Sequence, residues 1–129
     1  MGDPWEAYAA AHVDITFERG AVTWVPGGSQ SLPPGVPSPL WVVTACNPGG
    51  QRRADEANEA ANEALIAEVR EAGWRYWPAV GRNAGGTWQE PSVAIAGATR
   101  SEVLALARRY AQGAVFEIGA PGLQVVAVG

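Results

Sequence analysis

The sequence predicts an α+β protein with a ferredoxin-like core, in which strands and helices follow the order β-α-β-β-α-β. From Leu40 onward, apolar runs of strand length alternate with two segments of helical periodicity, separated by capping or turn residues. A length of 129 residues with 47% hydrophobic residues suits one domain with a buried core. We therefore expect an antiparallel sheet with both helices on one face. The single domain 1–129 is expected to divide into an N-terminal helix and β-hairpin (1–25), an extended connection (26–39) and the core with an extra C-terminal strand (40–129).

The N-terminal region carries the signals of a short helix followed by a hairpin. Asp3 is a suitable N-cap, proline follows it, and Glu6 completes a capping box, so a helix of about 4–11 is predicted. The segment "VDITFERGAVTWV" alternates β-branched and polar residues about a turn at Gly20, as a β-hairpin does. Residues 26–39 are rich in proline, glycine and serine, which predicts an extended connection without regular structure.

The first half of the core begins with the nearly continuous apolar run "LWVVTAC", which is typical of a buried strand. Residues 54–72 have helical periodicity, and Gly73 is placed to end that helix. "WRYWPAVG" and "SVAIAG" are predicted strands, joined by the loop "RNAGGTWQEP". Pro78 cannot donate to a sheet ladder, so its strand is expected at an edge.

The second half of the core begins with a helix predicted over about 100–111. Thr99 and Glu102 have the spacing of a capping box for this helix. "AVFEIG" and "LQVVAV" then form a predicted hairpin through "APG". One alternative stays open for the whole fold, namely an α+β arrangement in which the N-terminal hairpin intrudes into the sheet.

Two asparagines interrupt the apolar face of the helix predicted at 54–72. Successive helical residues are offset by about 100°, so Asn58 and Asn62 fall about 20° and about 60° from Leu65 on the buried stripe. A buried amide without partners costs roughly 1–3 kcal/mol, so both asparagines are expected to belong to a polar pocket. Three glutamates fall on the opposite, solvated side of the helix: Glu56, Glu59 and Glu63.

Polar residues from three separate loops are expected at one end of the sheet. In β-α-β-β-α-β topology the first strand-to-helix loop, the loop between the second and third strands and the exit of the second helix share that end. They bring together Asn47, Asn58, Arg82, Glu90 and Gln112, which makes this end the predicted binding site.

The same residues suggest a ligand class. Gly49, Gly50 and the start of the first long helix can approach an anion with backbone amides, and Arg82 can clamp it by a bidentate contact. Glu90 is expected to act as an acceptor or as the best candidate base. Two structural alternatives stay open: Glu90 pairs with Arg82 simply to close a loop, or the amides form an internal network that binds nothing.

Composition excludes several other classes of function. With 13 acidic residues against 9 arginines the formal charge is −4, so a nucleic acid is not expected as a partner. Cys46 is the only cysteine and His12 the only histidine, so we expect no disulfide, no metal site and no cofactor. Nothing places these two residues together as a nucleophile and its base. The absence of a signal peptide or membrane-spanning segment predicts a cytoplasmic protein with no membrane partner.

Six tryptophans in a chain of this size favour a second class of function, an interaction module. Tryptophans on an open sheet face or edge can bind a protein partner or a second copy as a homodimer. Four positions are candidates for such a surface: Trp5, Trp24, Trp74 and Trp88.

Four segments resemble a known family when they are taken in order along the chain. "TACNPGGQRRADEANEAANEAL", "PAVGR", "WQEPS" and "ARRYAQGAVFE" are similar to the bacterial domain of unknown function 3293 family, small stand-alone proteins. The resemblance implies no activity. The chain departs from the usual pattern of the family at Ala54, where serine is common, and at Tyr110, where phenylalanine is usual. Cys46 occupies a position at which the family is variable. The residues it stresses are Asn47, Pro48, Asn58, Gly81, Glu90, Ser92 and Gln112.

The functional expectation from the sequence is therefore a binder of a small polar or anionic ligand. The ligand-binding residues are predicted to be Asn47, Asn58, Asn62, Arg82, Glu90 and Gln112. Whether the site also catalyses a reaction stays open, and the interaction module is the alternative.

Overall fold

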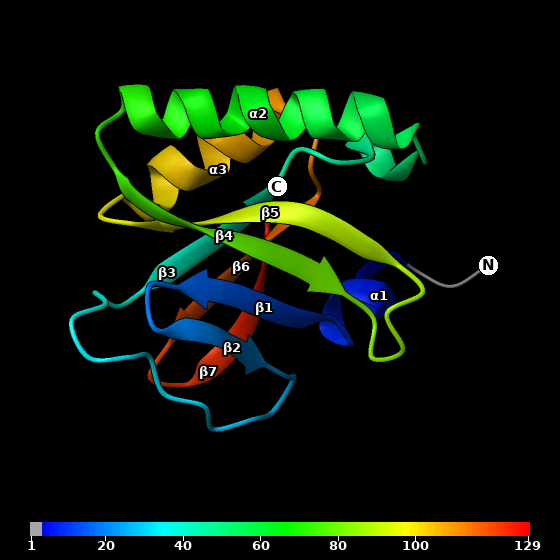
Figure 1. Ribbon diagram of the computed structural model, residues 1–129. Helices are drawn as coiled ribbons and strands as arrows, with labels where there is room; N and C mark the ends of the chain where they lie inside the picture. Colours follow the sequence, from blue (N-terminus) through cyan, green and yellow to red (C-terminus); the bar gives the residue numbers. More distant parts are fainter. Residues whose placement is uncertain (1–3) are drawn as a thin grey trace.

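The computed structural model describes residues 4–129 and shows an α+β fold with one curled antiparallel sheet (Figure 1). The helices are α1 (Pro4–Ala9), α2 (Asp55–Glu71) and α3 (Arg100–Arg109), with a 3-10 turn η1 (Pro48–Gly50). The strands are β1 (His12–Phe17), β2 (Gly20–Trp24), β3 (Leu40–Thr44), β4 (Arg75–Arg82), β5 (Gln89–Ala96), β6 (Ala114–Gly119) and β7 (Gly122–Ala127). They lie in the order β2-β1-β4-β5-β3-β6-β7. The N-cap predicted at Asp3 lies outside the described residues.

Helices α2 and α3 cover the same face of the sheet, as Figure 1 shows. Leu65 and Val69 of α2 are fully buried, and they share one core cluster with Val103 and Leu106 of α3. The sheet contributes alternate residues to this cluster, such as Val43 of β3. The apolar stripes that predicted the two helices therefore also orient them.

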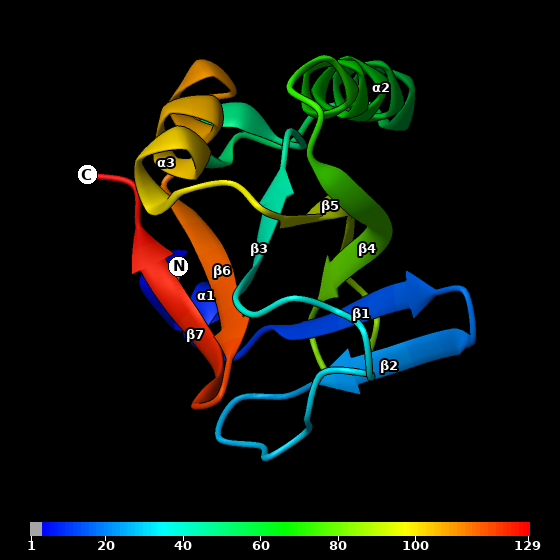
Figure 2. The same ribbon diagram turned by 90° about the vertical axis from the view of Figure 1, so that its left-hand side faces the viewer.

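A second core fills the opposite face of the sheet. The β1–β2 hairpin swings beneath the central strands, and the connection 25–39 passes alongside it (Figure 2). Ile15 and Trp24 are buried in this core together with Val42 of β3. Because β3 is buried on both faces, it needs the unbroken apolar run seen in its sequence.

The N-terminal hairpin adds to the sheet beside β4 and does not separate the core strands. Its strand β1 pairs with β4 in the register His12↔Arg82 to Ile15↔Ala79. The edge position expected for the strand containing Pro78 is therefore wrong, since β4 lies between β1 and β5. The pairing of β4 with β1 ends at Ala79, next to Pro78, so the missing N–H falls where pairing with β1 has stopped.

Capping and glycine residues in the sequence predicted the start of α3 and the end of α2. The capping box of α3 is confirmed: Thr99 Oγ1 accepts from the backbone N–H of Glu102 at 3.1 Å, and Glu102 accepts in return from Thr99 at 2.9 Å. Gly73 follows α2 with a φ of 78°, a left-handed conformation that glycine adopts without strain. The hairpin through "APG" is also present as the pair β6–β7.

Candidate functional site

A cavity of about 640 Å³ opens at the end of the sheet where the three predicted loops meet. We call it the sheet-end cavity. It lies between α1, the loop from β3 to α2, the loop from β4 to β5, and the exit of α3. Its principal side chains are Tyr8, Asn47, Arg52, Arg53, Asn58, Trp88, Glu90 and Gln112. Four of the six predicted site residues therefore line one cavity.

Asn47 connects the walls of this cavity. Its backbone is left-handed (φ 48°, ψ 57°), a conformation that asparagine tolerates better than most residues. Its Oδ1 accepts from the backbone N–H of Arg53 at 2.8 Å and from Nδ2 of Asn58 at 3.0 Å. Asn58 Oδ1 accepts in turn from the Asn47 backbone N–H at 3.0 Å. The inward asparagine that the helical wheel predicted on α2 thus holds the entry of its own helix.

Glu90 lines the cavity and has little access to solvent, and we call the part of the cavity around its carboxyl the inner end. The residue is 9% exposed, and its Oε2 accepts from Nδ2 of Asn47 at 2.7 Å. None of the ion pairs formed within residues 4–129 includes Glu90. Burial raises the pKa of this carboxyl, and the hydrogen bond from Asn47 opposes the increase only in part. A carboxyl of this kind can hold a proton at a higher pH than an exposed one.

Residues next to Glu90 are affected by the same burial or hold its backbone in place. Burial raises the pKa of Tyr8, and the nearby charge of Glu90 raises it further. Gly81 lies directly opposite Glu90 in the β4–β5 ladder, and the Ser92 hydroxyl donates to the Glu90 carbonyl at 3.1 Å. These contacts fix the backbone from which Glu90 projects.

Gln112 joins the exit of α3 to the end of β3. Its Nε2 donates to the carbonyl of Cys46 at 2.9 Å and to that of Tyr110 at 3.1 Å, and the residue is 8% exposed. The backbone N–H of Gly49 donates to the Ala111 carbonyl at 2.8 Å, which ties the same two segments together. The amide of Gln112 is thereby held rigidly at the cavity wall.

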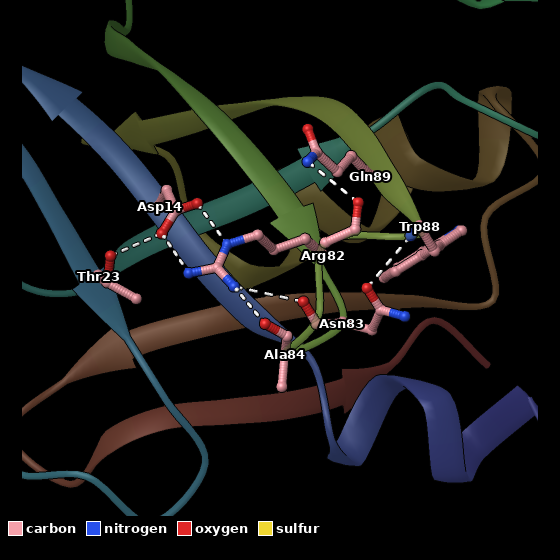
Figure 3. Close-up of polar contacts among 8 residues, drawn as sticks. Asp14, Thr23, Arg82, Asn83, Ala84, Trp88 and Gln89 are labelled. Carbon is pink, nitrogen blue, oxygen red and sulfur yellow. Dashed lines mark hydrogen bonds and ion pairs between the residues drawn. The ribbon is translucent and has the colours of Figure 1, made fainter.

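Arg82 is not brought to this cavity, which corrects the predicted anion clamp. Its guanidinium lies against Asp14 of β1, with Nε 2.7 Å and Nη2 3.2 Å from the carboxylate, and Nη1 donates to the carbonyls of Asn83 and Ala84 (Figure 3). The reason is strand alternation: Gly81 pairs with Glu90, so Arg82, one residue further, points to the other face of the sheet. The alternative of an Arg82–Glu90 ion pair is wrong for the same reason.

Asn62 is also absent from the cavity lining. It is half-buried one turn further along α2, as predicted, whereas the three glutamates on the outer face are exposed. Its Oδ1 is a buried atom without a hydrogen-bond partner, and within residues 4–129 it is the one side-chain atom in that condition. The expected role of Asn62 in binding has no geometric support.

Sequence reasoning missed most of the other residues that line the cavity, and four of them matter for its chemistry. Arg52 and Arg53 follow Asn47 in the same loop, and that proximity was a usable signal for them. Trp88 was assigned to an interaction surface, although its position two residues before Glu90 places it near the site. Tyr8 gave no signal, because only the docking of α1 brings it to the cavity; its ring meets Phe116 edge-on with centroids 6.5 Å apart.

The other chemical candidates are not supported within the described part of the chain. Cys46 is buried, its thiol donates to the Pro91 carbonyl at 3.5 Å, and burial raises its pKa, which disfavours the reactive thiolate. Residues 4–129 contain no cluster of three histidine, cysteine or acidic side chains able to hold a metal ion. No helix in this range has the length and apolar character needed to cross a bilayer.

Comparison with known proteins assigns the chain to a family. No curated protein and no solved structure matches it. A family model described as protein of unknown function (DUF3293) matches residues 43–115, which is more than half of the chain. The matched range contains Asn47, Asn58, Glu90 and Gln112, and it excludes Tyr8. On this match, the chain belongs to the DUF3293 family of proteins.

Proposed function

We propose that the sheet-end cavity binds a small polar molecule. The observation that carries this proposal is the convergence of Glu90 and Gln112, both more than nine-tenths buried, on one cavity of about 640 Å³. Cavities of this size suit small ligands, and a few placed polar groups among apolar ones give such sites their specificity. Within residues 4–129 the Glu90 carboxylate accepts one side-chain hydrogen bond, at Oε2 from Asn47, so its other oxygen can accept from a ligand.

An anionic part of the ligand is supported by Arg52 and Arg53. Both line the cavity, both are exposed, and neither side chain forms an ion pair within residues 4–129. They take the role that the sequence assigned to Arg82. Helix α2 begins beside them with Ala54 at its N-cap, which provides no side-chain hydrogen bond to the first backbone amides.

A ligand screen by thermal shift tests this proposal. Nucleotides, sugar phosphates and amino acids are added to the wild type, to an Arg52→Ala/Arg53→Ala double variant and to Arg19→Ala. Arg19 is exposed in the β1–β2 turn, away from the sheet-end cavity, so its variant controls for the loss of positive charge. A compound should stabilise the wild type and Arg19→Ala but not the double variant. Failure of every compound to stabilise the wild type contradicts the proposal.

Glu90 is the best-placed group for acid–base chemistry at this site. It faces the cavity, and its raised pKa brings proton exchange closer to neutral pH. We assign no reaction to it. Incubation of a bound compound with wild type and Glu90→Gln, followed by NMR of the compound, would show a turnover that depends on the carboxyl.

The interaction module is a weaker second candidate. Trp24 and Trp77 are buried in the core, and among residues 5–129 only Trp5 and Val25 are exposed large hydrophobic residues. A protein interface of ordinary size usually needs a contiguous apolar centre. Light scattering tests the homodimer directly, and a dimer mass at micromolar concentration would revive this candidate.

We also propose that strands β3 to β6 with α2 and α3 form a ferredoxin-like core. The support is the neighbour order β4-β5-β3-β6, antiparallel throughout, with both helices packed into one core cluster. An experimental structure with a different neighbour order would contradict it. The single-domain organisation, the bacterial origin and the cytoplasmic location stay predictions of the sequence.

A further inference from the structure

We propose that the inner end of the sheet-end cavity receives an organic cation, an ammonium or guanidinium group of the ligand, between the Glu90 carboxylate and the rings of Tyr8 and Trp88. The inference rests on the proposed function and adds the chemical class of the ligand. It makes the expected ligand a molecule with both charges, its cation inside and its anion towards Arg52 and Arg53.

The first observation is a missing counter-charge. Glu90 is more than nine-tenths buried, yet within residues 4–129 it has one side-chain partner, the neutral amide of Asn47. Buried charges are normally paired, because removing a charge from water without compensation is costly. A cation placed in the cavity would complete the pairing.

The second observation is the aromatic lining of the same cavity. Tyr8 and Trp88 are both half-buried, and they enter from separate elements, α1 and the β4–β5 loop. Both residues line the same cavity as the Glu90 carboxyl. Aromatic faces attract organic cations, and the attraction strengthens where water is excluded. A carboxylate with two aromatic neighbours thus favours an organic cation.

An inorganic cation fits less well. Divalent metal ions need several oxygen or nitrogen ligands, and residues 4–129 contain no group of three acidic, histidine or cysteine side chains that could supply them. An ammonium or guanidinium needs only one carboxylate together with carbonyl or amide acceptors.

The proposal predicts a pH dependence for cation binding. The titratable and charged groups around Glu90 are Tyr8 of α1, Cys46 at the end of β3, Arg52 and Arg53 of the following loop, and Asp55 of α2. Burial raises the pKa of the Glu90 carboxyl, and the ionisation of this carboxyl sets the charge that faces the cation. Affinity for a cation should rise as pH increases through that pKa, because only the ionised carboxylate attracts it.

Three probes that share one carbon skeleton test the inference: 4-aminobutyrate, n-butylamine and butyrate. Each is titrated by NMR into wild type, Glu90→Gln and Glu59→Gln, following the indole and backbone signals of Trp88. Glu59 is exposed on the outer face of α2, so Glu59→Gln removes the same charge away from the cavity. We expect each of the two amines, 4-aminobutyrate and butylamine, to bind Glu59→Gln with the same affinity as the wild type. Each should bind Glu90→Gln at least about tenfold more weakly.

The outcomes separate this inference from the proposal on which it rests. If butyrate binds and neither amine binds, the proposed ligand site is supported and the inference of a bound cation is refuted. Equal binding of the amines to Glu90→Gln also overturns it. If no probe binds although the thermal-shift screen finds a ligand, the cation is overturned and the ligand site stands; if the screen also finds none, both are contradicted. Should Glu90→Gln fail to fold, butylamine titration of the wild type across pH decides, since affinity that does not rise with ionisation of Glu90 refutes the inference.

Discussion

Substitution of Asn47 is the sharpest test of the site geometry. Asn47→Ala removes three side-chain hydrogen bonds at once, from the Arg53 backbone N–H, from Asn58 Nδ2 and to Glu90 Oε2. It also places alanine at a φ of 48°. Loop, helix and β5 are joined through this one side chain, so we expect a large loss in the free energy of unfolding.

The magnitude follows from the individual contacts. Each bond to a neutral partner contributes about 1 kcal/mol, and the bond to the Glu90 carboxylate at 2.7 Å contributes about 1.5 kcal/mol or more. The left-handed backbone costs alanine about 1 kcal/mol more than asparagine. The expected loss for Asn47→Ala is therefore about 4.5 kcal/mol.

Urea unfolding followed by tryptophan fluorescence measures this loss. Asn47→Gly is the matched control, because glycine accepts the left-handed backbone but makes none of the three bonds. We expect it to lose about 3.5 kcal/mol, which separates the backbone effect from the hydrogen bonds. A loss below about 1 kcal/mol in both variants would show that Asn47 does not hold the site together.

Three other predictions concern buried polar groups. Asn62→Leu should raise the free energy of unfolding by about 1 kcal/mol in urea, because it removes a buried amide oxygen without a partner, and a loss would show that Asn62 Oδ1 has one. Tyr110→Phe should cost about 1 kcal/mol, since the hydroxyl donates to Glu68 and so connects the end of α3 to α2. That bond is the main reason the pKa of Glu68 is lowered. The difference in free energy of unfolding between wild type and Tyr110→Phe should therefore disappear as pH falls through the range in which Glu68 becomes protonated. A difference that does not depend on pH would contradict this. Burial raises the pKa of Glu90 in the folded state, so the folded protein binds more protons than the unfolded chain. The stability of the wild type should therefore fall as pH rises from the pKa of Glu90 in the unfolded chain through its pKa in the folded protein. In thermal unfolding, Glu90→Gln should lack this decrease and should match the wild type in acid.

The sequence was most informative wherever the physical cause is local. The capping box of Thr99 and Glu102 spans one turn of helix, and the two residues alone determine it. The inward position of Asn58 follows from its spacing to Leu65 along α2. The convergence of Asn47, Asn58, Glu90 and Gln112 needed one further step, the β-α-β-β-α-β element order, and this order was readable from periodicity.

Long-range docking decided what the sequence left undetermined. Asp14 is 68 residues from Arg82, and only the pairing of β1 with β4 makes it the partner of that arginine. Strand alternation then directs Arg82 away from Glu90, an outcome that depends on the register of β4 with β5.

By itself, then, the sequence determined the elements, their apolar faces and the four polar residues at one end of the sheet, because these follow from short-range spacing and chain order. The tertiary structure alone decided that β4 is internal, that Tyr8 of α1 lines the sheet-end cavity, and that Arg52 and Arg53 line this cavity while Arg82 does not. These features depend on contacts between segments far apart in the chain, and no local pattern records them.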